Sequence, residues 1–269
     1  MVAELLVVGG GNMGTALLRG LISSGWVPES LAVSDSDAST RDRLCEALPG
    51  LDVRESPVAA KGAVLAVKPA DAESACRALS SSPIPRVLSV MAGVRTTLLE
   101  AWMPDKVVVR AMPNTPALLG EGASALSAGS RSQESDLRWA EEILGAVGIV
   151  VRVPDASLDA VTGLSGSGPA YLFYLAEGLI EAGVRQGLTS EVSTALVLQT
   201  FVGSARMLTE SGEPPEILRA RVTSPGGTTE AGISVLEGHG FTETLADAVA
   251  AASSRSRELG AEQTTKPKE

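Results

Sequence analysis

The sequence predicts an α/β amino-terminal domain, with a doubly wound, mostly parallel sheet, followed by an all-α carboxyl-terminal dimerisation domain. Three observations lead to this fold class. A GxGxxG motif stands between a strand pattern and a helix pattern near the start of the chain. Short apolar runs of strand type recur as far as residue 153, and only helical patterns follow. The predicted parts are residues 1–153, residues 154–261 and a polar, disordered tail at 262–269.

The composition indicates a sizeable core built from small apolar side chains. The chain has 269 residues, enough for two domains, and 44% are hydrophobic although only 3% are aromatic. A net charge of −10 argues against nucleic acid, whose phosphates attract lysine and arginine. No apolar run reaches the ~18 residues of a membrane helix, and no leader pattern precedes the first strand. We expect a cytoplasmic location and no nucleic-acid or membrane partner.

The two cysteines do not suggest a metal site. Cys45 and Cys76 lie in helix-like surroundings, without a CxxC motif or a neighbouring histidine. Thiols in a reducing cytosol are favoured over a disulfide, which the sequence alone leaves open. We expect no bound metal.

The first strand, residues 5–8, runs directly into the glycine motif, and a helix pattern follows at residues 15–24. In this arrangement the first glycine makes the turn, the second admits a pyrophosphate, and the third lets helix and strand pack closely. The helix amino terminus then faces the phosphates. This is the Rossmann arrangement, and it predicts a dinucleotide cofactor. The predicted cofactor-binding residues here are Gly9, Gly10, Gly11, Asn12, Met13 and Gly14.

The second strand, residues 31–34, ends at Ser34 and is followed by Asp35, about twenty residues after the glycine motif. An acid at this place binds a ribose 2′-hydroxyl and would repel a 2′-phosphate, so Asp35 favours NADH. Ser34, Ser36, Arg41 and Arg43 keep NADPH open, because hydroxyls and guanidinium groups can hold that phosphate. An ordinary solvent-facing turn residue is the alternative for Asp35.

The later strand patterns lie at residues 63–67, 87–91, 107–110, 123–127 and 149–153. The carboxyl ends of parallel strands face the ligand, so Val67, Lys68 and Pro69 are expected along the cofactor. Asn114 follows another strand and stands between two prolines that stiffen its loop. Such a loop suits aiming an amide at a nicotinamide or substrate, although stiff loops also occur without a catalytic role.

Helical patterns in the second half cover residues 170–186, 190–211, 230–237 and 242–260. The pattern at 190–211 is apolar around much of the helix circumference. A helix on the surface of one small domain normally has only one apolar face. We therefore interpret this helix as a subunit interface.

A turn rich in glycine and threonine, residues 222–232, is the stretch around which this half is organised. Proline ends one helix, Gly226 and Gly227 permit unusual backbone angles, and Thr228 and Thr229 stand where a new helix begins. A helix start with free amides beside hydroxyls can receive a carboxylate or phosphate. A plain turn with an N-cap is the alternative. A second small-residue stretch, residues 162–171, contains Ser167 and exposes amides and hydroxyls at another helix start, although by itself it is better interpreted as a flexible connector.

The motifs GGGNMG, AVKP, RAMPNTPALLGEG, SGSGPAY and RVTSPGGTTEAG occur in this order along the chain. This ordered set resembles the Δ1-pyrroline-5-carboxylate reductase family, which catalyses the last step of proline synthesis. The resemblance covers residues 5–259 and is most specific in the SPGGTTEAG and SGSGPAY segments. It implies NADPH or NADH as hydride donor, pyrroline-5-carboxylate as substrate, proline as product, and an interleaved homodimer that can form larger rings.

The resemblance also implies site residues. Ala66, Val67, Lys68 and Pro69 would hold the cofactor, and Asn114 would lie near the nicotinamide. We assign catalytic roles to Thr229 and Thr228, with the Thr229 hydroxyl contacting the ring nitrogen. The expected substrate-binding residues are Ser224, Gly226, Gly227, Thr228, Thr229, Ser167 and Asp155, the last as an acid that favours an iminium cation or, alternatively, as an N-cap.

The shortage of histidine and lysine side chains that could move a proton is consistent with an imine substrate. A hydroxy-acid dehydrogenase needs a histidine or lysine to move the alcohol proton. The only histidine, His239, lies between two glycines, and no lysine occurs between Lys106 and Lys266. A cyclic imine can carry its own proton, so positioning suffices. A β-hydroxyacid dehydrogenase-like or F420-type oxidoreductase and a non-enzymatic NAD(P)H sensor stay as alternatives.

Overall fold

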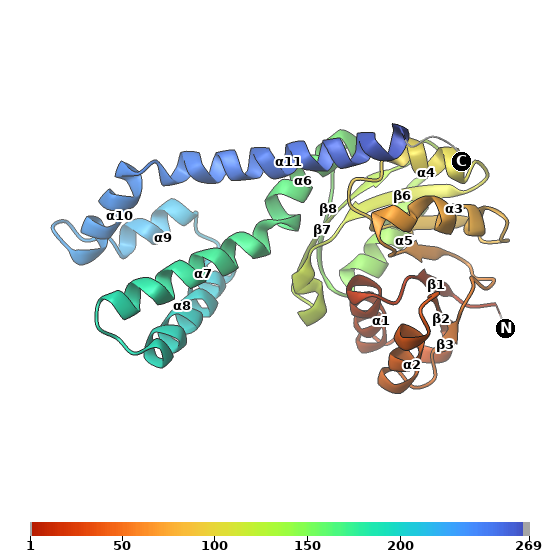
Figure 1. Ribbon diagram of the computed structural model, residues 1–269, viewed down its shortest axis with the longest axis horizontal. Coiled ribbons are helices and arrows are strands. Elements are labelled where there is room, and N and C mark those ends of the chain that lie inside the picture. The colour runs from red at the N-terminus through yellow and green to blue at the C-terminus, as the bar shows by residue number, and fades with distance from the viewer. Residues whose placement is uncertain (1, 266–269) are drawn as a thin grey trace. The chain divides into compact units, whose positions relative to one another are not determined.

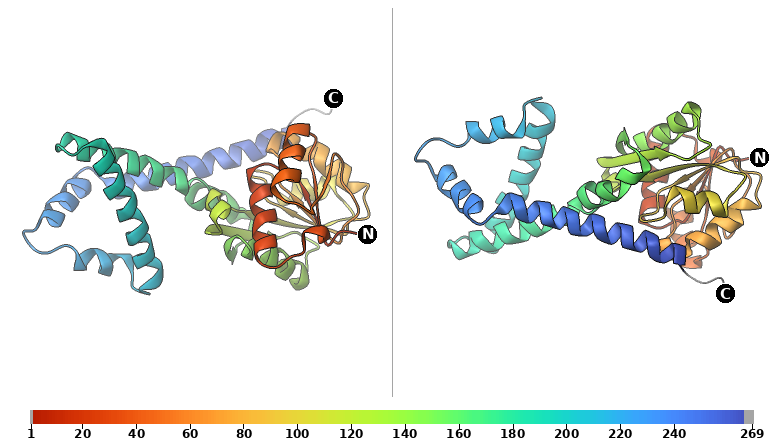
Figure 2. Two further views of the ribbon diagram at one scale, coloured as in Figure 1. Left: turned by 90° about the horizontal axis from the view of Figure 1, so that it is seen from below. Right: turned by 90° about the horizontal axis from the view of Figure 1, so that it is seen from above.

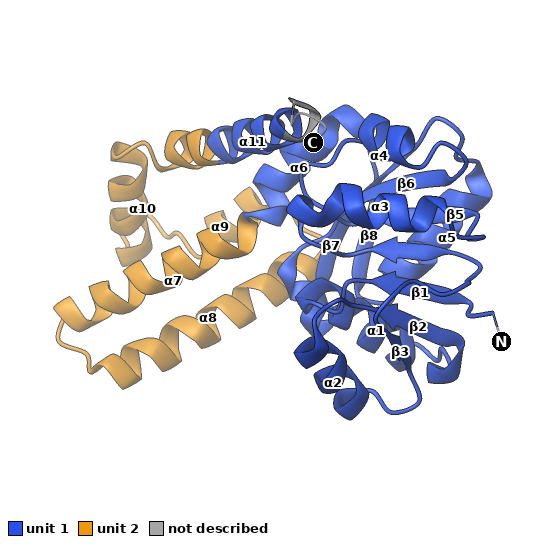
Figure 3. Cartoon of the chain, turned by 45° about the vertical axis from the view of Figure 1, so that its right-hand side comes forward, with its two compact units in different colours: residues 1–167, 249–269 blue, residues 168–248 orange. Residues whose placement is uncertain are grey.

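The computed structural model describes residues 2–265, and for residues 263–265 only the main chain. The chain divides into two compact units (Figure 3). The first unit contains the chain up to Ser167 and again from Val249, and the second unit contains residues 168–248. This division differs from the boundary expected at 153/154.

Residues 154–167 and 249–262 both belong to the first unit, and they contact each other closely. The Ser256 hydroxyl donates to Asp159 Oδ1 at 2.6 Å, and both side chains are buried. At Gly163, a Cβ atom would lie only 2.2 Å from Ser253 Oγ, so the last helix, α11 (Phe241–Thr265), approaches this segment closely.

The first unit is built on one eight-stranded sheet with the strand order β3-β2-β1-β4-β5-β6-β7-β8. All neighbouring strands are parallel except β6 and β7, which are antiparallel. The predicted doubly wound, mostly parallel sheet is confirmed. The strands are β1 Leu5–Val8, β2 Leu31–Ser34, β3 Asp52–Arg54, β4 Ala63–Leu65, β5 Arg86–Ser89, β6 Val107–Met112, β7 Gly122–Ala128 and β8 Gly148–Arg152.

Helices cover both faces of this sheet (Figures 1 and 2). Successive strand side chains point to opposite faces. Leu5 and Val7 therefore pack with α1 (Asn12–Ser23), α2 (Ala38–Ala47) and α5 (Glu134–Gly145). Leu6 and Val8 pack on the other face with α3 (Ala72–Ser80) and α4 (Thr96–Trp102). The core of the first unit thus lies in two apolar layers, one on each side of the sheet.

Short helical segments join these elements. They are η1 Pro28–Ser30, η2 Pro69–Asp71, η3 Thr115–Leu119, η4 Asp155–Ser157, α6 Leu158–Val161 and the π-helical turn η5 Thr162–Gly166. The stretch at 162–166, for which a flexible connector was one reading, is therefore helical.

The second unit consists of α7 Gly168–Arg185, α8 Ser190–Glu210, α9 Pro215–Arg221, α10 Thr228–Gly238 and the first part of α11 Phe241–Thr265. No apolar side chain is buried anywhere in residues 168–248, all of which the structure describes. The one buried residue is Ser193, whose hydroxyl donates to the Ile180 carbonyl at 2.9 Å. The second unit therefore has no apolar core of its own.

The predicted tail at 262–269 needs a correction. Helix α11 continues to Thr265, so residues 262–265 are helical rather than disordered. Arg255 stabilises this last part by pairing with Glu258 at 3.0 Å and Glu262 at 2.9 Å. Residues 266–269 lie outside the described residues. None of the helices in the described part combines the length and apolar character of a membrane span.

A buried cation fastens the segment after β8 to the sheet. The Arg110 side chain on β6 is only 3% exposed, and its Nη1 lies 3.1 Å from Asp155 Oδ1. The same oxygen accepts a hydrogen bond from the Thr96 hydroxyl at 2.5 Å. Asp155 therefore neutralises a charge that water does not reach.

We predict that Asp155→Ala lowers the free energy of unfolding by about 2–4 kcal/mol, because it leaves the buried Arg110 guanidinium unpaired. Urea denaturation at a fixed protein concentration measures this change. The control, Glu134→Gln, weakens an ion pair with Arg152 in which both side chains are more than a third exposed. That variant should cost less than about 1 kcal/mol. Equal effects of the two variants would contradict the role assigned to Asp155.

Candidate active site

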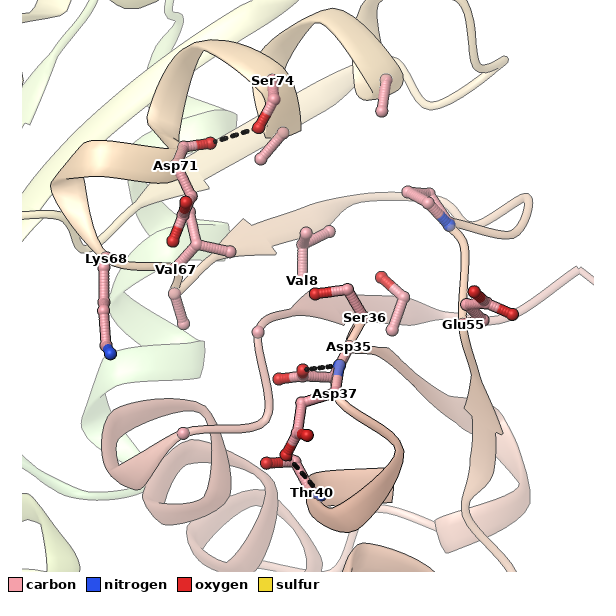
Figure 4. A pocket seen from close by; sticks show the side chains of 17 residues that line it. Val8, Asp35, Ser36, Asp37, Thr40, Glu55, Val67, Lys68, Asp71 and Ser74 are labelled. Carbon is pink, nitrogen blue, oxygen red and sulfur yellow. Dashed lines mark hydrogen bonds between the residues drawn. The ribbon is translucent and has the colours of Figure 1, made fainter. Parts of the chain in front are cut away.

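A cleft of about 610 Å³ opens in the first unit beside the carboxyl ends of β1, β2 and β4 (Figure 4). From β1 the chain adds β2 and β3 on one side, and it then adds β4 and the later strands on the other side. In doubly wound folds, ligands bind where the strand order changes in this way. Of the predicted cofactor-binding residues, those that line the cleft are Gly9, Gly11, Ser34, Asp35, Ala66, Val67 and Lys68.

Two glycines of the loop, Gly9 and Gly14, leave no room for a side chain. Gly9 has a φ of +103°, and a Cβ atom there would lie 2.6 Å from the Ala66 carbonyl oxygen. A Cβ atom on Gly14 would lie 2.0 Å from the Gly9 carbonyl oxygen. The first turn of α1 contains no acid, and its N-cap, Gly11, makes no side-chain cap bond. These α1 amides are therefore suited to receive a phosphate.

Asp35 ties the loop after β2 to the glycine loop. Its Oδ2 accepts from the Gly10 amide at 2.7 Å, and its Oδ1 accepts from the Asp37 amide at 2.9 Å. Each carboxylate oxygen has a second lone pair, so the carboxylate retains capacity for a ligand hydroxyl.

Other predicted cofactor residues support the cleft from outside its lining. Gly10, Asn12, Met13 and Gly14 belong to the glycine loop and α1, and Pro69 begins η2. Asn114 is not among the cleft-lining residues. Its Oδ1 accepts from the Ala123 amide at 2.8 Å, and its Nδ2 donates to the Ser165 carbonyl at 3.1 Å. In the structure this amide joins β7 to the η5 segment, so its contact with a nicotinamide stays a prediction.

Sequence reasoning missed several cleft residues, among them Asp37, Thr40, Glu55, Asp71 and Ser74. Asp37 is the N-cap of α2 and accepts from the Thr40 amide at 2.8 Å. Hydrogen bonds from Ser39 and Thr40 lower the pKa of Asp37 to about 2, so its carboxylate is charged at neutral pH. An acid just before a helix pattern is a recognisable N-cap signal. Glu55 follows β3, whose three residues carry no apolar pattern.

The loop that precedes α10 carries the predicted substrate residues of the second unit. Gly226 has a φ of +70°, which favours glycine, and its amide donates to Glu230 Oε2 at 2.7 Å. The Gly227 amide donates to the Ser224 carbonyl at 3.0 Å. Glu230 was not predicted, although an acid at the third position of a helix is a known capping signal.

The first amides of α10 stay available. The N-cap, Gly227, makes no side-chain cap bond. Within residues 2–265, the amides and hydroxyls of Thr228 and Thr229 have no hydrogen-bond partner. A helix amino terminus with free amides and two hydroxyls can receive a small anion.

The structure brings only part of the predicted substrate set together. Ser224 and residues 226–229 lie in one turn of the second unit, whereas Ser167 and Asp155 belong to the first unit. The Ser167 amide donates to the Thr162 carbonyl at 2.8 Å, and Asp155 pairs with Arg110.

Comparison with known families agrees with this division of roles. The family profile described as "Pyrroline-5-carboxylate reductase dimerisation" matches residues 155–259. The profile described as "NADP oxidoreductase coenzyme F420-dependent" matches residues 4–93, which contain the glycine loop and much of the cleft.

Similar proteins span nearly the whole chain. The pyrroline-5-carboxylate reductase of Pseudomonas aeruginosa is 42% identical, over 95% of this chain and 96% of the relative. That of Synechocystis sp. is 40% identical, over 97% and 99%. A solved pyrroline-5-carboxylate reductase from Coxiella burnetii superposes with a TM-score of 0.89 at 37% identity, covering 96% of this chain and 99% of the other. The Plasmodium falciparum enzyme, solved with NADP bound, has a TM-score of 0.81 at 32% identity, covering 96% and 98%. This chain belongs to the pyrroline-5-carboxylate reductase family.

Proposed function

We propose that the protein reduces the cyclic imine L-1-pyrroline-5-carboxylate to L-proline with NADPH or NADH. The observation that carries this proposal is the full-length similarity to enzymes of that name, at 42% identity over 95% of the chain in one case. The similarity includes both the cleft of the first unit and the loop before α10. Fold likeness alone would not support a substrate.

The first unit fits a dinucleotide cofactor. The glycine loop would admit the pyrophosphate, the α1 amides would bind its oxygens, and Asp35 would accept from a ribose hydroxyl. Ala66, Val67, Lys68 and Pro69 follow β4 and would lie along the cofactor. When bound, the reduced nicotinamide supplies a hydride for C5 of the substrate.

The loop before α10 fits the substrate. Its free amides at Thr228 and Thr229 would bind the carboxylate, together with Ser224, Gly226 and Gly227, and the Thr229 hydroxyl would contact the ring nitrogen. Ser167 and Asp155 stay proposed contacts, with the Arg110 pair as the competing role of Asp155. The imine nitrogen is basic enough to carry its own proton, so these groups need only to bind and orient.

We also propose that the protein is a homodimer in the cytoplasm, formed by helices of two second units that interleave. Exposed apolar side chains on α7 and α8 support this, including Phe173 at 64% and Leu196 at 56% exposure. The match to a dimerisation profile over residues 155–259 supports it as well. A larger ring stays a prediction.

The decisive experiment for the activity is addition of pyrroline-5-carboxylate to the purified protein with NADH or NADPH. We expect loss of absorbance at 340 nm together with formation of proline. The β-hydroxyacid dehydrogenase alternative is tested by the oxidised cofactors with hydroxy acids, which should give no signal. Cofactor binding without turnover of the imine would favour the sensor alternative.

Thr229→Val should lower kcat/KM by roughly tenfold to a thousandfold, the effect of losing a hydrogen-bond donor in the transition state. The matched control is Thr244→Val, which removes a first-turn hydroxyl of α11 that bonds the Gly240 carbonyl. Steady-state kinetics of the two variants, with thermal unfolding as a check on folding, make the comparison. Near-wild-type kinetics for Thr229→Val would remove this hydroxyl from the mechanism.

Leu196→Glu should convert the dimer to a monomer or unfold the second unit, because it places a charge on the apolar surface of α8. Light scattering coupled to size exclusion measures the mass, and circular dichroism measures the helix content. Val27→Glu is the control, since Val27 is 59% exposed and lies in the first unit. An unchanged mass and helix content for Leu196→Glu would argue against this interface.

A further inference from the structure

One buried hydroxyl in the cleft has no partner. Ser34 is only 2% exposed, and its Oγ has no hydrogen-bond partner in the described structure. It ends β2 and lines the cleft. Burial of an unpaired hydroxyl costs free energy, and such groups are rare in folded proteins. A polar group of a ligand at the carboxyl end of β2 would satisfy it.

The surroundings of Ser34 are acidic. Asp35 and Asp37 follow β2, and Glu55 follows β3, and all three line the cleft (Figure 4). Lys68 comes from the opposite side of the cleft, after β4, where Asp71 also lies (Figure 4). The β2 and β3 side of the cleft therefore presents three carboxylates and no lining cation.

The arginines of α2 and β3 make contacts within the protein. Arg41 Nη1 donates to the carbonyls of Asp35 at 2.8 Å and Ser36 at 2.9 Å. Arg43 Nη2 donates to the Gly10 carbonyl at 2.9 Å. Neither arginine lines the cleft. Arg54, at the end of β3, pairs with Asp52 at 2.6 Å.

We propose that the acidic residues Asp35, Asp37 and Glu55 select NADH over NADPH, and that the Ser34 hydroxyl binds the cofactor ribose. This inference rests on the proposed use of a nicotinamide cofactor. The ribose diol of NADH carries hydroxyls that donate to the Asp35 carboxylate and pair with the Ser34 hydroxyl. The 2′-phosphate of NADPH has no proton to donate at neutral pH, and Asp37 and Glu55 repel its negative charge.

The first test measures affinity rather than turnover. Isothermal titration of the full-length protein, without substrate, gives Kd for NADH and for NADPH. We expect NADH to bind at least about tenfold more tightly at low salt, and the ratio to shrink at high salt as the repulsion is screened. Equal or tighter binding of NADPH would overturn the proposal.

Charge removal identifies the residues responsible. Asp37→Ser keeps a good N-cap for α2 but removes the negative charge of Asp37. Glu55→Gln removes the negative charge of Glu55. Each should tighten NADPH binding by about threefold to tenfold and change the Kd of NADH by less than about twofold. The control is Glu46→Gln, an exposed position of α2 that does not line the cleft and should change neither Kd. If Asp37→Ser and Glu55→Gln behave like the control, the acidic side is not the selector.

Ser34→Ala separates ligand binding from folding. The Kd of NADH should rise about fivefold, the effect of one hydrogen bond. The melting temperature of the unliganded protein should not fall, because the lost hydroxyl had no partner. A lower melting temperature with an unchanged Kd would assign Ser34 a structural role and contradict the proposal.

The two proposals fail in different experiments. Reduction of pyrroline-5-carboxylate by a protein that prefers NADPH would overturn the cofactor inference alone. Tight, selective NADH binding without imine reduction would overturn the proposed function alone.

Discussion

The helical half of the chain depends on a surface that it cannot bury by itself. Residues 168–248 form long helices, yet the only buried residue among them is a serine. Burial of apolar surface is the main favourable contribution to folding, so helices with exposed leucines and phenylalanine need a second surface. The loop before α10, which is the proposed substrate site, lies in this half. In the proposed dimer its order would be coupled to association, and binding of a second copy would stabilise the fold and the proposed site together.

The first unit does not share this dependence. Its sheet has an apolar layer on each face, and its cleft is shaped by contacts between main-chain atoms and small groups. The Asp35 carboxylate holds the amides of Gly10 and Asp37, and the close approach of Gly9 to Ala66 excludes any side chain. A site shaped by backbone in this way is preorganised before the cofactor binds, which reduces the ordering cost of binding.

The fold was predictable where a local pattern carried it. The glycine motif, the longer strands and the long helices were all predicted, whereas β3 was missed because three residues with two charged ends give no periodicity. The return of α11 to the first unit depends on contacts such as Ser256 with Asp159, nearly a hundred residues apart, which no local pattern contains. At the site, Asp35 was predicted from its spacing. Its bonds to two amides, the capping role of Glu230 and the amide contacts of Asn114 needed coordinates.

The chemistry of the substrate explains why such a plain set of groups suffices. Acid and base catalysis is needed where a reacting atom must gain or lose a proton that water or the substrate cannot handle. The one histidine, His239, is exposed just after α10, and its Nδ1 lies 2.8 Å from the Val235 carbonyl. A cyclic imine can carry its own proton, and in the proposed site its carboxylate would be bound by helix amides. In the proposed site the loop therefore has only to position the substrate, and a helix that begins with two threonines would do so without a titratable side chain.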